Sequence, residues 1–94
     1  MINQDQLKDI SKRIIAIGDY LKIKDKRDQF REEELKTQDP DFWNDSKTAE
    51  IQMKSIRSLK YWIEEFDKLE ESFGDIEVLF DFAKAGEGDE KEVD

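Results

Sequence analysis

A single proline, Pro40, divides this chain of 94 residues into two stretches of helical periodicity. Proline cannot donate the hydrogen bond of a helix interior, and it keeps the residue before it out of the helical region. The sequence around it, DPDFWND over residues 39–45, consists of turn-forming residues and two aromatic ones. The chain is therefore expected to be helical on both sides of this segment and to reverse direction there, as an antiparallel helical hairpin.

The first half of the chain carries an apolar stripe with a shift in phase. Its first members are spaced three and four residues apart, the spacing of one helical face, and predict a helix over residues 4–21: Leu7, Ile10, Ile14, Ile17 and Leu21. The stripe then moves to Ile23, Phe30 and Leu35. This shift predicts a bend near residues 22–25 and a second helix over 24–37, with Asp25 as its N-cap.

The segment around Pro40 is predicted to form a structural junction built from Pro40, Phe42, Trp43 and Asn44. Asp41, Asn44 and Asp45 have side chains that accept hydrogen bonds from the free amides of a helix start. The two aromatic side chains are expected to fold back over the end of the bundle.

The second half predicts one long helix over residues 46–73, because apolar residues recur there at heptad intervals: Ala49, Ile56 and Ile63, with Leu59, Phe66 and Phe73. Gly74 suits the position after a helix end and Asp75 suits an N-cap, which predicts a break and a short helix over 75–85. That short helix is apolar on two faces, so Val78 and Phe82 are expected to be covered by other segments or by a second copy.

These segments predict an all-α fold, an elongated antiparallel helical bundle over residues 1–85. An acidic, disordered linker toward further domains is expected over residues 86–94. Two shorter helices would lie along one long helix.

Charge and composition exclude several classes of function. Residues 1–38 hold nine Lys and Arg against eight Asp and Glu, whereas residues 39–94 hold seven against seventeen. A polyanion is repelled by such an acidic half, so little direct binding of nucleic acid is expected. The chain has no histidine and no cysteine, and no apolar run reaches the roughly 20 residues of a membrane span. A cytoplasmic protein without a disulfide is the expectation.

Catalytic and metal sites are not expected. Asp39, Asp41 and Glu50 occupy three positions of a calcium-binding EF-hand loop, but Asn44 stands where that loop needs glycine. The glutamate pairs fit solvated helix faces better than acid–base pairs, which depend on burial. We therefore predict no catalytic residue, no bound cofactor and no metal.

One basic cluster interrupts the acidity. We call the following residues the basic bend: Lys22, Lys24, Lys26, Arg27 and Arg31. Two interpretations remain open: a solvated bend, or a positioning contact with an acidic partner surface or an RNA phosphate edge. A looser basic row follows on the long helix, at Lys47, Lys54, Arg57 and Lys60.

The order of these features resembles the N-terminal domain of bacterial class I peptide chain release factors. The matching elements are GDYL at residues 18–21, PDFWN at 40–44, the long helix and the acidic EGDEKE at 87–92. The resemblance implies a factor that terminates translation at UGA and UAA codons. It also implies that the Ser-Pro-Phe codon-reading and Gly-Gly-Gln hydrolysis motifs of the family, neither of which occurs in this chain, lie in other domains.

The resemblance further implies a partner and a role. The chain would be a ribosome-docking domain that contacts protein at the stalk base of the large subunit, with the basic bend as the candidate contact, and it would not itself be an enzyme. The alternative is a free-standing acidic adaptor that binds another helical protein through a coiled coil.

Overall fold

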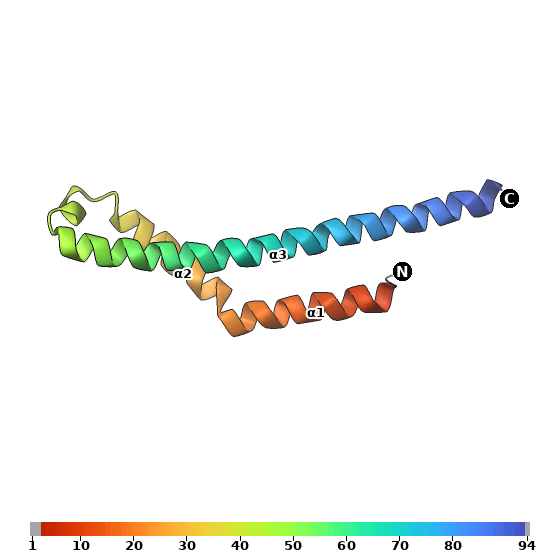
Figure 1. The fold of residues 1–94 in the computed structure, drawn as a ribbon, viewed down its shortest axis with the longest axis horizontal. Coiled ribbons are helices and arrows are strands. Elements are labelled where there is room, and N and C mark those ends of the chain that lie inside the picture. The colour runs from red at the N-terminus through yellow and green to blue at the C-terminus, as the bar shows by residue number, and fades with distance from the viewer. Residues whose placement is uncertain (1–2, 94) are drawn as a thin grey trace.

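The computed structural model describes the backbone of residues 3–93 and the side chains of residues 3–86. Helix α1 (Gln4–Leu21) leads into α2 (Ile23–Lys36), a short 3-10 helix η1 (Pro40–Trp43) makes the reversal, and α3 (Ser46–Val93) returns. In Figure 1, α1 and then α2 run in one direction along the molecule, and α3 runs back in the opposite direction. The molecule measures 73 × 24 × 16 Å. The predicted all-α, elongated, antiparallel arrangement is confirmed for the described residues.

The start of α1 is fixed by a capping box. The Asn3 side chain accepts a hydrogen bond from the Gln6 amide at 2.8 Å, and the Gln6 side chain accepts one from the Asn3 amide at 2.9 Å. Two amides that a helix start leaves free are thereby satisfied. This orders the first turn of a helix whose contacts with α3 are few.

The predicted bend lies at one residue, Lys22. Its φ and ψ of 53° and 49° place it in the left-handed region, where it serves as the C-cap of α1 and the N-cap of α2. Its amide donates to the carbonyl of Asp19 at 3.2 Å, so the end of α1 stays hydrogen-bonded. The prediction that Asp25 caps α2 was wrong. The helix restarts at Ile23, which buries Ile23 at the bend.

Helix α3 does not break at Gly74, so the predicted stop at 73 and the separate helix over 75–85 were wrong. A glycine inside a helix costs only about 0.5–1 kcal/mol. A break would also have interrupted the apolar row Phe66, Phe73 and Phe80, whose heptad spacing continues across Gly74 and faces α1. Continuity of that row outweighs the weak local preference for a stop.

The predicted linker over 86–94 falls on the end of α3, whose helical backbone is described to Val93. The side chains of 87–94 lie outside the described residues, so a linker role there stays a prediction. Val78 and Phe82 lie before this segment and are 53% and 72% exposed, so the described residues leave both largely uncovered.

The core is a seam one side chain deep between α3 and the other two helices. Its buried apolar residues are Leu7, Ile14, Ile23, Ala49, Ile56, Leu59 and Phe66, and none of the described side chains is fully enclosed. Ile14, Ile23 and Phe66 form a cluster where the three helices meet, with Ile10, Leu21 and Phe73 packed against it. The apolar stripes predicted for α1 and α3 supply this seam.

Two residues predicted on the buried faces of α1 and α2 are only partly covered by the seam. Ile17 is 42% exposed and Leu35 is 61% exposed. A two-layer hairpin buries only the centre of each helical stripe, because nothing in the described structure covers the flanks.

Helices α1 and α3 lie close together at Gly18. A Cβ atom at this position would lie 2.9 Å from Cζ of Phe66, whereas one at Gly74 would meet nothing within 4 Å. Phe66 is buried in the seam, so its ring has little room to move. The absence of a side chain at Gly18 therefore sets how near the two helices lie.

We predict opposite outcomes for alanine at the two glycines. Gly74→Ala should stabilise the chain by about 0.5–1 kcal/mol through helix propensity alone. Gly18→Ala gains the same propensity but overfills the seam, which costs about 1–3 kcal/mol, so its net effect should be destabilising. Urea unfolding followed by circular dichroism measures both, and equal stabilisation would contradict the close contact at Gly18.

Candidate functional site

The basic bend predicted from sequence lies at the junction of α1 and α2, where two of its lysines face solvent. Lys22 and Lys24 are exposed, and no ion pair involves either of them in the described part of the chain. Lys26 is engaged within the chain, since its Nζ donates to the carbonyl of Leu21 at 2.5 Å. That bond satisfies a free carbonyl at the end of α1.

Arg27 is also used within the fold. Its Nη2 donates to Oδ1 of Asp67 at 2.5 Å and lies 3.8 Å from Oε1 of Glu70, which ties α2 to α3. The hydrogen bond to Asp67 is the main influence that raises the pKa of the Arg27 guanidinium above its usual value. We call Arg27, Asp67 and Glu70 the clasp. Its arginine holds the bend in place and is not a free contact for a partner.

Arg31 and two of the four residues of the basic row on α3, Lys54 and Lys60, have acidic neighbours. Arg31 lies 3.8 Å from Asp28 on the same helix. Lys54 and Lys60 lie 3.8 Å from Glu50 and Glu64, each four residues away. Exposed pairs of this kind add little stability, but they reduce the positive field available to an acidic partner.

The predicted junction residues do build the reversal. Asp39 caps η1 by accepting from the amide of Asp41 at 3.0 Å, and Pro40 occupies the first helical turn, where its missing amide costs nothing. The Asn44 side chain donates to Asp41 Oδ1 at 3.2 Å. The turn is therefore closed by its own side chains.

The two aromatic residues of this reversal, Phe42 and Trp43, differ in how deeply they are buried. Their rings contact each other edge to face with centroids 4.8 Å apart. Phe42 is half-buried, whereas Trp43 is 55% exposed and is held by its Nε1, which donates to the carbonyl of Thr37 at 3.1 Å. Phe42 thus contributes more of the predicted apolar cover, and Trp43 links the end of α2 to η1.

Asp45 caps α3, as the sequence predicted. Its carboxylate accepts from the amides of Lys47 and Thr48 at 3.1 and 3.3 Å and from the Thr48 hydroxyl at 2.8 Å. The hydroxyl bond is the largest of the influences that lower the pKa of the Asp45 carboxyl from its ordinary value. The start of α3 is therefore favoured by an ionised side chain.

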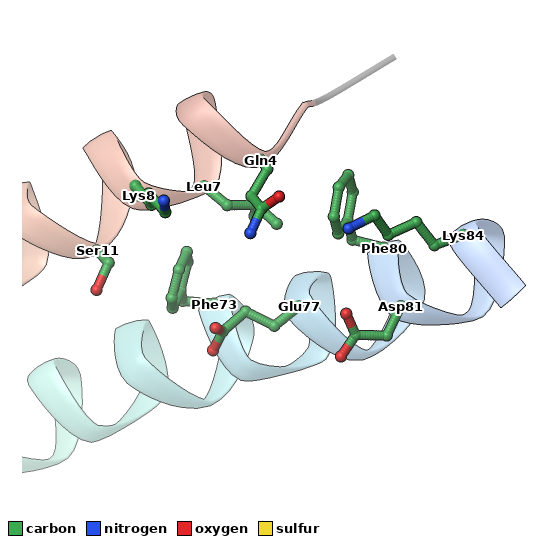
Figure 2. A pocket seen from close by; sticks show the side chains of 9 residues that line it. All are labelled: Gln4, Leu7, Lys8, Ser11, Phe73, Glu77, Phe80, Asp81 and Lys84. Atoms are coloured by element: carbon green, nitrogen blue, oxygen red, sulfur yellow. The ribbon is translucent and has the colours of Figure 1, made fainter.

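A shallow hollow of about 300 Å³ opens between the start of α1 and the later part of α3. Figure 2 shows Phe73 and Phe80 projecting from α3 toward Leu7 of α1. The charged side chains around it, which carry both signs, are all exposed: Lys8, Glu77, Asp81 and Lys84. With no buried polar group to orient a ligand, the hollow marks loose helix packing rather than a small-molecule site.

The described residues contain no cluster of three acidic, histidine or cysteine side chains placed to hold a metal ion. Asp39 and Asp41, weighed above as calcium ligands, are instead engaged in the turn. Within the same part of the chain, no helix combines the length and apolar character needed to cross a membrane.

Sequence reasoning missed Asp67 and Glu70 as partners of Arg27. Acidic residues are frequent on the faces of α3, and a contact forty positions away leaves no periodic signal in the sequence. The predicted bend did offer one signal for this contact. Arg27 follows Ile23 by one helical turn and therefore lies on the side of α2 that meets α3.

Comparison with known proteins finds similarity to peptide chain release factor 2. The chain is 28% identical over 87 residues to peptide chain release factor 2 of Aliivibrio fischeri, and 26% identical over 85 residues to the same factor of Proteus mirabilis. These alignments cover 93% and 90% of this chain but only 24% and 23% of the relatives, so the chain spans about a quarter of their length. No family model matches the chain. No solved structure matches it either.

The clasp should make a small, salt-sensitive contribution to stability. Its side chains are more than a third exposed, so Arg27→Met should destabilise the chain by less than about 1 kcal/mol, and the loss should shrink between about 0.1 M and about 1 M NaCl. Arg31→Met is the matched control, because its pair joins neighbours on one helix. Equal losses for the two variants at both salt concentrations would contradict a specific clasp.

The Asp45 cap should weaken in acid. Because folding lowers the pKa of Asp45, the ionised cap contributes fully above its ordinary pKa, and the contribution is lost as pH falls through the lowered value. The Tm of the wild type should exceed that of Asp45→Asn at pH 7, and the gap should close below about pH 4. Circular dichroism melts across this range would detect it, and a gap that persists in strong acid would rule out the ionised cap.

Proposed function

We propose that this chain is the N-terminal positioning domain of a bacterial peptide chain release factor, a cytoplasmic protein that terminates translation at UGA and UAA codons. The observation that carries the proposal is the similarity to release factor 2 from two organisms over nine-tenths of this chain. The helical hairpin and the junction at Pro40 agree with the resemblance that the sequence itself suggested.

In this role the chain orients other domains and performs no chemistry. The Ser-Pro-Phe and Gly-Gly-Gln motifs are absent from its sequence, and the acidic side chains of α3 described above line no enclosed pocket. A rod 73 Å long, stiffened by capped helix starts and by the clasp, suits a spacer that sets where codon-reading and hydrolytic domains lie.

The proposed partner surface is protein at the stalk base of the large ribosomal subunit. Within the basic bend, Lys22 and Lys24 are the residues we assign to this contact, since Lys26 and Arg27 are engaged inside the fold. An exposed pair of positive charges would orient the domain on an acidic protein patch and accelerate association more than it would strengthen binding.

The rival function, an acidic adaptor that binds another helical protein, is favoured by one observation. Several large apolar side chains on α1 and α3 are between a third and three-quarters exposed, including Ile15, Trp62 and Phe82. Such an adaptor would have no need of ribosomes.

Binding of the chain to purified bacterial ribosomes tests the proposal. The unmodified chain should sediment with them, and the double variant Lys22→Glu and Lys24→Glu should bind about tenfold more weakly and with a flatter dependence on salt. The control carries the same change of charge elsewhere, at Lys12 and Lys47, and should bind like the wild type.

Two different results would contradict the proposed function and the proposed position of the contact. A chain that fails to associate with ribosomes would overturn the proposed function. Equal loss of binding in both double variants would show that net charge, rather than the basic bend, controls the association.

A further inference from the structure

One flank of the α1–α3 pair is apolar and uncovered. Gly18 lies opposite Phe66 and Leu7 lies beside Phe73 and Phe80, which fixes the antiparallel register of the two helices. At about 100° per residue, Ile10 and Ile17 of α1 then fall on the same side of the pair as Trp62, Leu69 and Ile76 of α3. We call these five residues the open face.

The members of the open face interleave along the seam. In the register set by Gly18 and Phe66, Ile17 falls between Trp62 and Leu69, and Ile10 falls between Leu69 and Ile76. Ile17, Trp62, Leu69 and Ile76 are each about 40% exposed, so each packs one edge into the seam and leaves the other uncovered. The three residues of α3 are spaced by heptads, the repeat with which one helix packs against another.

The open face is poor in charge, although the chain carries a net charge of −9. Of the acidic residues within 61–86, only Glu65 borders the face; Glu77 points about 80° from the middle of the face, toward the hollow on the other flank, and the others point about 100° or more away. On the α1 side the bordering charge is Arg13. Each of the two is paired on its own helix, Arg13 with Asp9 at 3.0 Å and Glu65 with Lys68 at 3.3 Å.

This distribution of charge favours one kind of binding partner for the open face over another. A basic partner helix would need an acidic rim, and the carboxylates of α3 lie on the other sides of the helix. A second copy meets no such requirement, because two charge-poor faces can approach while their acidic surfaces stay apart. A twofold axis would stack one α1–α3 layer on another and close a four-helix bundle.

The size of the face is sufficient for a weak dimer. The 18 residues of α1 extend about 27 Å, and two adjacent helices are about 20 Å wide. The layer therefore offers roughly 540 Å² per copy and about 1,100 Å² in total, just above the roughly 1,000 Å² that a specific interface needs. An interface this small is expected to bind with micromolar affinity or weaker.

We propose that the open face is a homodimer interface, through which two copies of this chain form a four-helix bundle. A second hollow, whose lining includes Ile15, Gly18 and Lys24, lies on one flank of the α1–α3 pair, and the interface lies on the opposite flank. The lysines assigned above to ribosome contact stay exposed in such a dimer, so this inference stands apart from the proposed function.

Two matched pairs of variants test the inference by sedimentation equilibrium over a wide range of concentration. On α1, Ile17→Glu should weaken dimerisation at least tenfold, whereas Ile15→Glu should leave it unchanged although Ile15 is the more exposed residue. On α3, Leu69→Glu should weaken it similarly, and Val78→Glu, which points away from the face, should not. Circular dichroism confirms that each variant keeps its helix content.

Each outcome decides for or against the interface. A wild-type chain that stays monomeric at the highest concentration overturns the proposal and leaves the open face to another partner. A dimer weakened equally by Ile15→Glu and Ile17→Glu, or unaffected by Leu69→Glu, places the interface elsewhere. Selective loss with Ile17→Glu and Leu69→Glu supports it.

Discussion

The contact between Gly18 and Phe66 is the constraint on which the rest of the structure depends. It brings α1 close to α3, and the cluster of Ile14, Ile23 and Phe66 forms around it. Because α1 lies so close there, the bend at Lys22 must turn the chain within one residue for α2 to meet α3 as well. The register of α1 on the long helix follows from this approach.

Strong local signals predicted most of the architecture from the sequence. Pro40 with its capping neighbours gave the reversal, and the phase shift from Leu21 to Ile23 located the bend. The wrong predictions of a cap at Asp25 and a break at Gly74 share a cause, since both rested on a weak local preference that packing overrides. Gly74 favours a helix end only slightly, and the heptad row through Phe66, Phe73 and Phe80 keeps α3 continuous across it.

The candidate site was less accessible to sequence reasoning, because a cluster of charges does not reveal which of its members the fold uses. Five basic residues lie close together along the chain, but the structure takes Arg27 into the clasp and Lys26 into the end of α1. What remains free is Lys22 and Lys24. That division depends on Asp67 and Glu70, which are distant in sequence.

The buried residues and polar contacts are distributed unevenly along the rod, and this affects the order in which the chain folds. The hairpin of α2, η1 and α3 as far as Glu70 holds five of the buried apolar residues, two capped helix starts and the clasp, whereas α1 adds only Leu7 and Ile14. The contacts next to the η1 turn join residues near in sequence, and such contacts form fastest. The hairpin can therefore act as the nucleus, with α1 docking last and detaching first, so that the two ends of one short molecule differ in how often they open.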